Sequence, residues 1–278
     1  MINCRIIDDL FETGNCKNYI LSIQCSLNGF SFLVYDTISG KFIAHIENEA
    51  VFSSPYELKK ELELRINSEA ILNQTYKRVV VSYQNMRFIL VPAFVDTEDN
   101  FEKILQTVFD KESDEHLASC DVFDGARMLF ALPNVLFSML SKKYTDCIFI
   151  APPMPLIRNG LANCFLQPTL FVARFSDLLI LILFHEKKVH FINQFYVKND
   201  TDCLYYILNT ASQLKLDMKT NLRIFGKISR KSVLVSMLQG YFMNVEFAST
   251  DKRFASSLST NDGHEHFLIP QIELTLCE

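Results

Sequence analysis

One spacing in the chain is typical of metal ligands, the alternation His264-Glu265-His266. On a β-strand, residues two positions apart point to the same face, so both imidazoles could reach a single metal ion. A catalytic zinc ion needs three protein ligands, and the sequence shows no third ligand beside these two. The surrounding stretch STNDGHEH is polar. We therefore interpret both histidines as exposed loop residues and predict no metal site.

A second pair, His185 and His190, flanks a short charged segment that is typical of a hairpin turn. We interpret these two histidines as incidental residues of a solvated turn. The chain has no nucleophile-elbow, zinc-protease, P-loop or Rossmann glycine motif. A Ser/His/Asp assembly does not require neighbouring residues, and nothing in the sequence selects one.

The composition of the 278-residue chain argues against two classes of function. Only 8 residues are glycine, which leaves little material for the glycine-rich loops of nucleotide-binding enzymes. The formal net charge is −5, so no strong attraction to the phosphates of nucleic acid is expected. The basic cluster of Lys227, Arg230 and Lys231 is interpreted as a solvated helix face.

The cysteines and the apolar segments indicate where the protein resides. The 8 cysteines form no C-x-x-C pair, and several lie in apolar runs, such as Cys147 in CIFIA. The longest apolar run, Leu178 to Phe184, is far shorter than the roughly 20 residues that span a bilayer. Asp8, Asp9 and Glu12 interrupt the apolar residues expected of a signal peptide. We expect a reduced, cytoplasmic protein without a membrane span.

The early half of the chain predicts three antiparallel strands, a helix and a further strand. Asp36 to Gly40 supplies a turn, and Gly40 is free to adopt a positive φ. Ser54 is the expected helix N-cap, Pro55 suits the first turn, and apolar residues then recur every four positions. The predicted elements are strands at 18–26, 29–36, 41–47 and 77–83 and a helix at 54–67.

The late half predicts the same order, with a second helix and strand added. Asn199 or Asp200 begins its first helix, and Ser229 is the expected cap of the second. Its continuous apolar run LLILILF suits a sheet covered on both faces. The predicted elements are strands at 168–176, 178–186, 188–197, 221–226 and 243–249 and helices at 199–216 and 229–241.

Additional α/β material lies between the two halves, as an inserted segment at about 88–145. It contains a strand, a helix capped near Thr97, two short strands joined by a turn at Asp124-Gly125, and another helix. A strand halted by two prolines and a helix at 154–165 follow. We therefore predict a first domain at 1–167 and a second at 168–278, both of the α/β class.

This repeated order resembles the duplicated ribonuclease-H-like unit of the actin-like ATPase superfamily. The resemblance is carried by RFILVPAFVD, ARMLFALPNVLFSML, and LLILILFHEKKVHFINQFYVKNDTDCLYYILNTASQLKLD with NLRIFGKIS after it. More narrowly, the chain resembles a bacterial domain-of-unknown-function family with this fold, and the actin-like cytoplasmic domains of pilus and secretion assembly proteins. The resemblance implies two actin-like lobes, each a mixed sheet with flanking helices.

In that superfamily the first hairpin turn of each lobe carries a D-x-G-type phosphate loop. Main-chain N–H groups of the turn surround phosphate oxygens, while the carboxylate holds Mg²⁺ directly or through water. The early turn of this chain has Ser26, Asn28 and Gly29, which supply a glycine but no carboxylate. The late turn has Ser176 and Asp177, which supply a carboxylate but no glycine.

The strand on the adenosine side of the superfamily cleft typically ends in paired glycines, and this chain offers only one, in Gly226-Lys227. Three partial matches imply a vestigial nucleotide cleft in a fold retained without hydrolysis. Its residues would be Ser26, Asn28, Gly29, Ser176, Asp177, Gly226 and Lys227. The alternative for each is an ordinary turn or strand end, since Asn-Gly is also a strong hairpin turn.

We therefore predict a non-catalytic pseudo-ATPase that acts as a binding or scaffold module for a protein partner, with no required cofactor and no nucleic acid. The competing interpretation is an ATP-binding protein, ATPase or kinase that holds ATP and Mg²⁺ in the interlobe cleft. In the C-terminal stretch FLIPQIELTLCE we expect four apolar residues to be buried, Ile269, Ile272, Leu276 and Cys277. The resemblance implies that this stretch packs back toward the first lobe.

Overall fold

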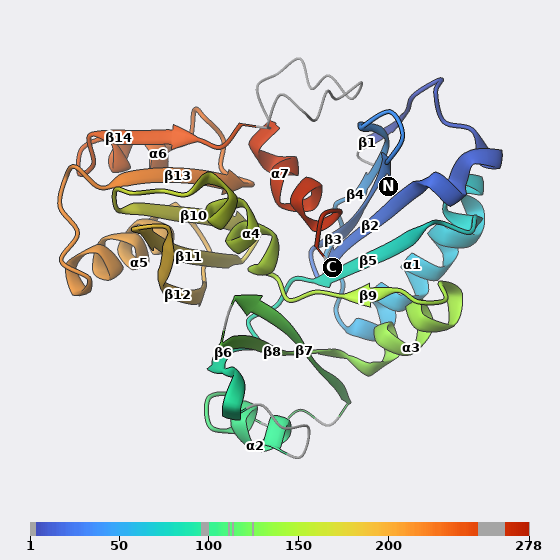
Figure 1. Ribbon diagram of the computed structural model, residues 1–278, viewed down its shortest axis with the longest axis horizontal. Helices are drawn as coiled ribbons and strands as arrows, with labels where there is room; N and C mark the ends of the chain where they lie inside the picture. Colours follow the sequence, from blue (N-terminus) through green and yellow to red (C-terminus); the bar gives the residue numbers. More distant parts are fainter. Residues whose placement is uncertain are drawn as a thin grey trace. The chain divides into compact units, whose positions relative to one another are not determined.

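The computed structural model describes residues 4–277 except 96–99, 111, 113, 124 and 250–264. The described chain forms two compact units, residues 4–152 with 274–277 and residues 153–249 with 265–273. Each unit contains one large mixed sheet (Figure 1). The second unit begins at Pro153, whereas the sequence placed the junction near Gln167-Pro168.

The first unit is built on a six-stranded sheet. In spatial order its strands are β1 (Cys4–Ile7), β4 (Lys41–Asn48), β3 (Gly29–Asp36), β2 (Tyr19–Ser26), β5 (Arg78–Tyr83) and β9 (Ile148–Phe149). The predicted antiparallel meander is confirmed in β2, β3 and β4, and β5 pairs parallel to β2 after a crossover. The edge strand β1 was missed, because its four residues show no alternation of apolar and polar types.

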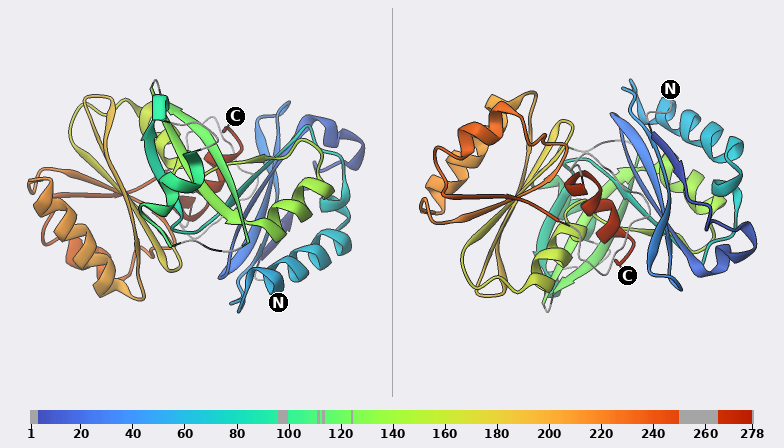
Figure 2. Two further views of the ribbon diagram at one scale, coloured as in Figure 1. Left: turned by 90° about the horizontal axis from the view of Figure 1, so that it is seen from below. Right: turned by 90° about the horizontal axis from the view of Figure 1, so that it is seen from above.

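Two helices, α1 (Pro55–Ser68) and α3 (Asn134–Lys143), lie side by side in the first unit (Figures 1 and 2). Ser54 caps α1 as predicted, because its side chain accepts a hydrogen bond from the main-chain N–H of Glu57. Apolar residues at four-residue spacing place one side of each helix in the core. These buried residues are Leu58, Leu62 and Ile66 of α1 and Leu136 and Leu140 of α3.

The inserted segment forms a small sheet of its own. Its strands in spatial order are β6 (Phe88–Pro92), β8 (Ala126–Pro133) and β7 (Glu115–Phe123). Helix α2 (Phe101–Gln106) packs on this sheet through Leu105, beside Leu129. The predicted helix cap Thr97 and turn residue Asp124 lie outside the described residues. Short 3-10 turns complete the unit at η1 (Thr13–Asn18), η2 (Ala70–Asn73) and η3 (Ala93–Val95).

The second unit is built on a five-stranded sheet. In spatial order its strands are β12 (Lys188–Tyr196), β11 (Leu178–His185), β10 (Thr169–Phe175), β13 (Asn221–Gly226) and β14 (Asn244–Phe247). Helices α5 (Asp200–Gln213) and α6 (Val233–Leu238) cover one face (Figure 2). Helix α4 (Met154–Asn163) packs with Gly160 against the ring of Phe184. Helix α7 (Glu265–Leu274) ends the unit.

The two large sheets repeat one topology. The order β4-β3-β2-β5-β9 of the first corresponds to β12-β11-β10-β13-β14 of the second, with the same parallel and antiparallel pairings. The register also shifts at the same point of the middle strand, between Val34 and Tyr35 in β3 and between Leu183 and Phe184 in β11. The predicted duplication of a sheet-and-helix unit is therefore confirmed.

Two predictions about the late half were wrong. Ser229 does not cap α6, which begins four residues later with Ser232 accepting from the N–H of Val235. His266 is not an exposed loop residue but a buried residue of α7. Asn199 does cap α5, with its side chain accepting from the N–H of Asp202. Within the described ranges, no helix is long and apolar enough to cross a bilayer.

Candidate functional site

The early turn is a tight two-residue hairpin between β2 and β3, closed by the pairing of Ser26 with Gly29. The N–H of Asn28 donates to Ser26 Oγ at 3.0 Å, so the turn uses this donor internally. Gly29 has φ of 133°, and a Cβ at this position would collide with the carbonyl oxygen of Asn48. The glycine is therefore required by the close approach of the end of β4.

The late turn, Ser176-Asp177, joins β10 to β11, and Ser176 lies in the left-handed region with φ of 55°. Arg174 supports it, because Arg174 Nε donates to the carbonyl oxygen of Ser176 at 3.0 Å. The same guanidinium donates through Nη1 to Asp200 Oδ1 at 2.7 Å. Asp200 is the first residue of α5, so this ion pair joins the sheet to the helix at the turn.

The end of β13 lies beside this turn. Gly226 has φ of 71°, and a Cβ there would collide with the carbonyl oxygen of Arg174 on the neighbouring strand. The N–H of Lys227 donates to that same oxygen at 2.8 Å, and the N–H of Ile228 donates to the carbonyl oxygen of Gly226 at 2.8 Å. Two consecutive main-chain donors after the strand are thus already bonded.

The structure brings four of the seven candidate residues to one edge. Ser176, Asp177, Gly226 and Lys227 follow β10 and β13, which are parallel, and the carboxyl ends of parallel strands meet at the same edge of a sheet. The remaining three belong to the other unit, at the carboxyl end of its β2. A phosphate-binding turn presents unbonded N–H groups to the anion. Those of Asn28, Lys227 and Ile228 donate within the protein instead.

The histidines form no metal centre in the part of the chain that the structure describes, where no three His, Cys, Asp or Glu side chains gather. His266 is fully buried, and its Nε2 donates to the carbonyl oxygen of Ile228 at 2.8 Å. Its predicted companion His264 lies outside the described residues. His185 and His190 flank a hairpin turn as predicted, with His190 Nε2 donating to the carbonyl oxygen of His185.

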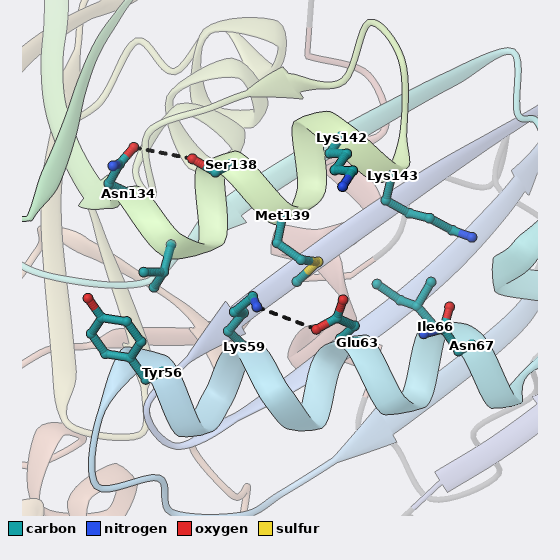
Figure 3. A pocket seen from close by; sticks show the side chains of 11 residues that line it. Tyr56, Lys59, Glu63, Ile66, Asn67, Asn134, Ser138, Met139, Lys142 and Lys143 are labelled. Carbon is teal, nitrogen blue, oxygen red and sulfur yellow. Dashed lines mark hydrogen bonds and ion pairs between the residues drawn. The ribbon is translucent and has the colours of Figure 1, made fainter.

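A groove between α1 and α3 in the first unit has a cavity volume of about 570 Å³ (Figure 3). Met139 of α3 points toward α1 in its middle (Figure 3). Lys59 and Glu63 form an ion pair of 3.5 Å along α1, and the Lys143 amine is hydrogen-bonded to Asn73. The lining is completed by Tyr56, Ile66, Asn67, Asn134, Val135, Ser138 and Lys142.

The comparison with protein families decides the classification. A family described as a protein of unknown function, DUF3822, matches residues 8–245. The chain belongs to the DUF3822 family. No curated protein matches the sequence.

Similar solved structures identify the fold of this DUF3822 member. A Bacteroides thetaiotaomicron protein with actin-like ATPase fold and unknown function has a TM-score of 0.81 at 21% identity, covering 97% of this chain and 100% of its own. The PilM–PilN type IV pilus biogenesis complex gives 0.64 at 11%, covering 92% and 97%. The ethanolamine utilization protein EutJ from Carboxydothermus hydrogenoformans gives 0.56 at 7%, covering 98% and 93%. The chain has the actin-like ATPase fold.

The sequence did not point to the residues that shape the late turn and the groove in this DUF3822 protein. Arg174 and Asp200 lie far apart in the chain, and only the pairing of β10 and the start of α5 brings them together. The groove depends on the contact of α1 with α3. The only signals of it in the sequence are the i,i+4 pair Lys59–Glu63 on α1 and the two lysines at the end of α3.

Proposed function

We propose that this DUF3822 protein is an actin-like-fold binding or scaffold protein that does not hydrolyse ATP and acts by holding a protein partner. The observation that carries the proposal is the bonding at the edge formed by Ser176 and Gly226. There the N–H groups of Lys227 and Ile228 donate to main-chain oxygens, and Arg174 bonds both the turn and Asp200.

This arrangement opposes phosphoryl transfer for electrostatic reasons. Hydrolysis requires N–H groups and Mg²⁺ that stabilise charge on the transferred phosphoryl group. Asp200 is a second carboxylate near the late turn, but its negative charge is compensated by the Arg174 guanidinium. The early turn has an amide at Asn28 where the superfamily pattern has a carboxylate. Neither turn by itself combines an acid and a glycine as that pattern requires.

A protein partner is supported by the similar fold of PilM, which has been solved in a complex with PilN. A bacterial protein of this family would then use the actin-like fold as a rigid framework for assembly. We place it in the cytoplasm, because its eight cysteines, all of which the structure describes, are thiols and not disulfides, as expected in a reducing compartment.

The second candidate function is nucleotide binding without turnover. It is favoured by one observation, the convergence of Ser176, Asp177, Gly226 and Lys227 at one sheet edge. ATP and Mg²⁺ would be the ligands in that case, with Asp177 as the carboxylate.

Thermal unfolding with and without Mg-ATP separates these functions. A ligand at 100 times its Kd stabilises the folded state by about 2.7 kcal/mol, which is easily seen as a higher Tm. The proposed function predicts an unchanged Tm at millimolar Mg-ATP. A higher Tm without phosphate release would replace it with nucleotide binding, and phosphate release would replace it with an enzyme.

A further inference from the structure

The groove between α1 and α3 has the form of a binding site rather than of a packing defect. Its volume of about 570 Å³ lies within the range of ligand pockets, roughly 300–1,000 Å³. Apolar side chains of Val135, Met139 and Ile66 line it together with polar side chains of Asn67, Ser138 and others. An apolar lining with a few polar groups is typical of pockets that recognise a ligand.

The groove differs in charge from the protein as a whole. Three lysines and one glutamate line it, which gives +2, whereas the complete chain carries −5. Glu63 is already paired with Lys59, so it does not offset the charge of Lys142 and Lys143. These two lysines lie at the end where α1 and α3 finish (Figure 3). The groove therefore has a positive end.

The opposite end of the groove is chemically different. Tyr56 and Asn134 lie there, where both helices begin (Figure 3). The Tyr56 hydroxyl donates to Asp114 Oδ2 at 3.0 Å, which places a carboxylate near this end. A bound segment with a single acidic group would thus be oriented, with its carboxylate toward the lysines and away from Asp114.

We propose that this groove binds a segment of a protein partner that carries an apolar side chain next to an aspartate or glutamate. The apolar side chain packs on Met139 and Val135, and the carboxylate contacts Lys142 and Lys143. Methionine adapts its shape to such side chains because it is unbranched and polarizable. The inference rests on the proposed function, since it gives the chemistry of the partner that the scaffold holds.

A peptide fits these observations better than a small anion. Phosphate alone would use the lysines but leave the apolar side chains of Val135 and Met139 exposed to water. A segment that joins an apolar side chain to a carboxylate satisfies both parts, because burial of apolar surface adds to the charge attraction.

Selection from a display library of short random peptides on the full chain tests the proposal without assuming a partner. The enriched peptides are expected to carry an acidic residue beside a large apolar one. Their Kd is then measured by fluorescence polarisation with the wild-type chain and with variants. Lys142→Glu should weaken binding by about tenfold or more, because it reverses a charge facing the carboxylate. Met139→Gln should also weaken binding.

Two variants serve as matched controls. Lys142→Arg retains the charge and should stay within about threefold of the wild type. Lys60→Glu makes the same charge reversal on α1 at an exposed residue that does not line the groove, and should leave binding unchanged. Higher salt should weaken the wild-type complex more than the Lys142→Glu complex.

Several outcomes would overturn the proposal. One is a library that yields no binder, or one whose enriched peptides lack acidic residues. Another is a peptide that binds Lys142→Glu as tightly as the wild type. A third is a peptide that inorganic phosphate displaces at a concentration similar to the peptide's Kd. Concentration-dependent self-association that Lys142→Glu abolishes would assign the groove to a second copy instead. Phosphate release from Mg-ATP would defeat the proposed function without changing the peptide result, so the two failures are distinguishable.

Discussion

Arg174 of β10 and Asp200 of α5 form an ion pair of 2.7 Å, with the arginine side chain only 17% exposed. The same guanidinium donates to the carbonyl oxygen of Ser176, so one side chain joins a strand, its turn and the start of a helix. In this family member, groups at the sheet edge where the actin-like pattern places phosphate are therefore hydrogen-bonded within the protein itself.

This pair should matter to stability. Arg174→Met leaves Asp200 and the Ser176 carbonyl oxygen without their donor and should lower the free energy of unfolding by about 2 kcal/mol. The control is Arg158→Met, because Arg158 is 43% exposed and pairs with Glu273 at 3.2 Å. We expect that variant to lose less than about 1 kcal/mol. Equal losses in urea unfolding would contradict the structural role of Arg174.

Gly226 should not tolerate a side chain. Gly226→Ala combines the cost of a positive φ with a collision against the Arg174 carbonyl oxygen and should destabilise the fold by about 3 kcal/mol. Gly125→Ala is the matched control, because Gly125 also has a positive φ, of 80°, but among the described residues none other than its chain neighbours lies within 4 Å of its Cβ position. It should cost about 1 kcal/mol. If both variants melt alike, the close approach of β10 to Gly226 is refuted.

His116 should make stability depend on pH. Its ring stacks on Phe137 with centroids 3.4 Å apart, and burial lowers the pKa of His116 below its usual value. The unfolded chain then takes up the proton first, so this contribution is full above about pH 6.5 and is lost as the pH falls from there through the lowered pKa of His116 in the folded chain. His116→Phe keeps the stack and should reduce the loss of stability between neutral pH and about pH 5. An unchanged loss in urea titrations would exclude His116 as its source.

Removal of residues 264–278 should destabilise both units. In the second unit His266 donates to Ile228, and in the first unit Arg78 Nη2 donates to the carbonyl oxygen of Thr275 at 2.9 Å. The expected residues Ile269, Ile272 and Cys277 are buried, and Leu276 is half-buried. We expect the shortened chain to unfold at lower temperature and less cooperatively. Cooperative melting identical to that of the full chain would refute this role.

The sequence predicts most of the two sheets because their signals are local. The run from Leu178 to Phe184 between turn residues defines a buried strand, and Ser54 and Asn199 bond N–H groups three residues away. Where two local signals compete, tertiary packing decides. Ser229 was the expected cap of the second helix, but Ser232 caps α6, whose Leu234 and Leu238 are buried.

Contacts between segments that lie far apart in the chain could not be predicted from the sequence. Helix α7 runs through Pro270 and buries His266, a residue that the polar sequence before it marked as exposed. The meeting of Lys142 with the α1 side of the groove depends on how two helices pack, and no spacing in the chain reports that. The actin-like pattern suggested where a nucleotide would bind, but the Arg174–Asp200 pair became visible only in the structure.

Steady-state release of inorganic phosphate from Mg-ATP shows whether this actin-like fold hydrolyses ATP. We expect the purified full chain to release phosphate no faster than buffer alone, and we expect Asp177→Asn, which removes the carboxylate of the late turn, to change nothing. Phosphate release that depends on the wild-type chain and disappears in Asp177→Asn would contradict this expectation.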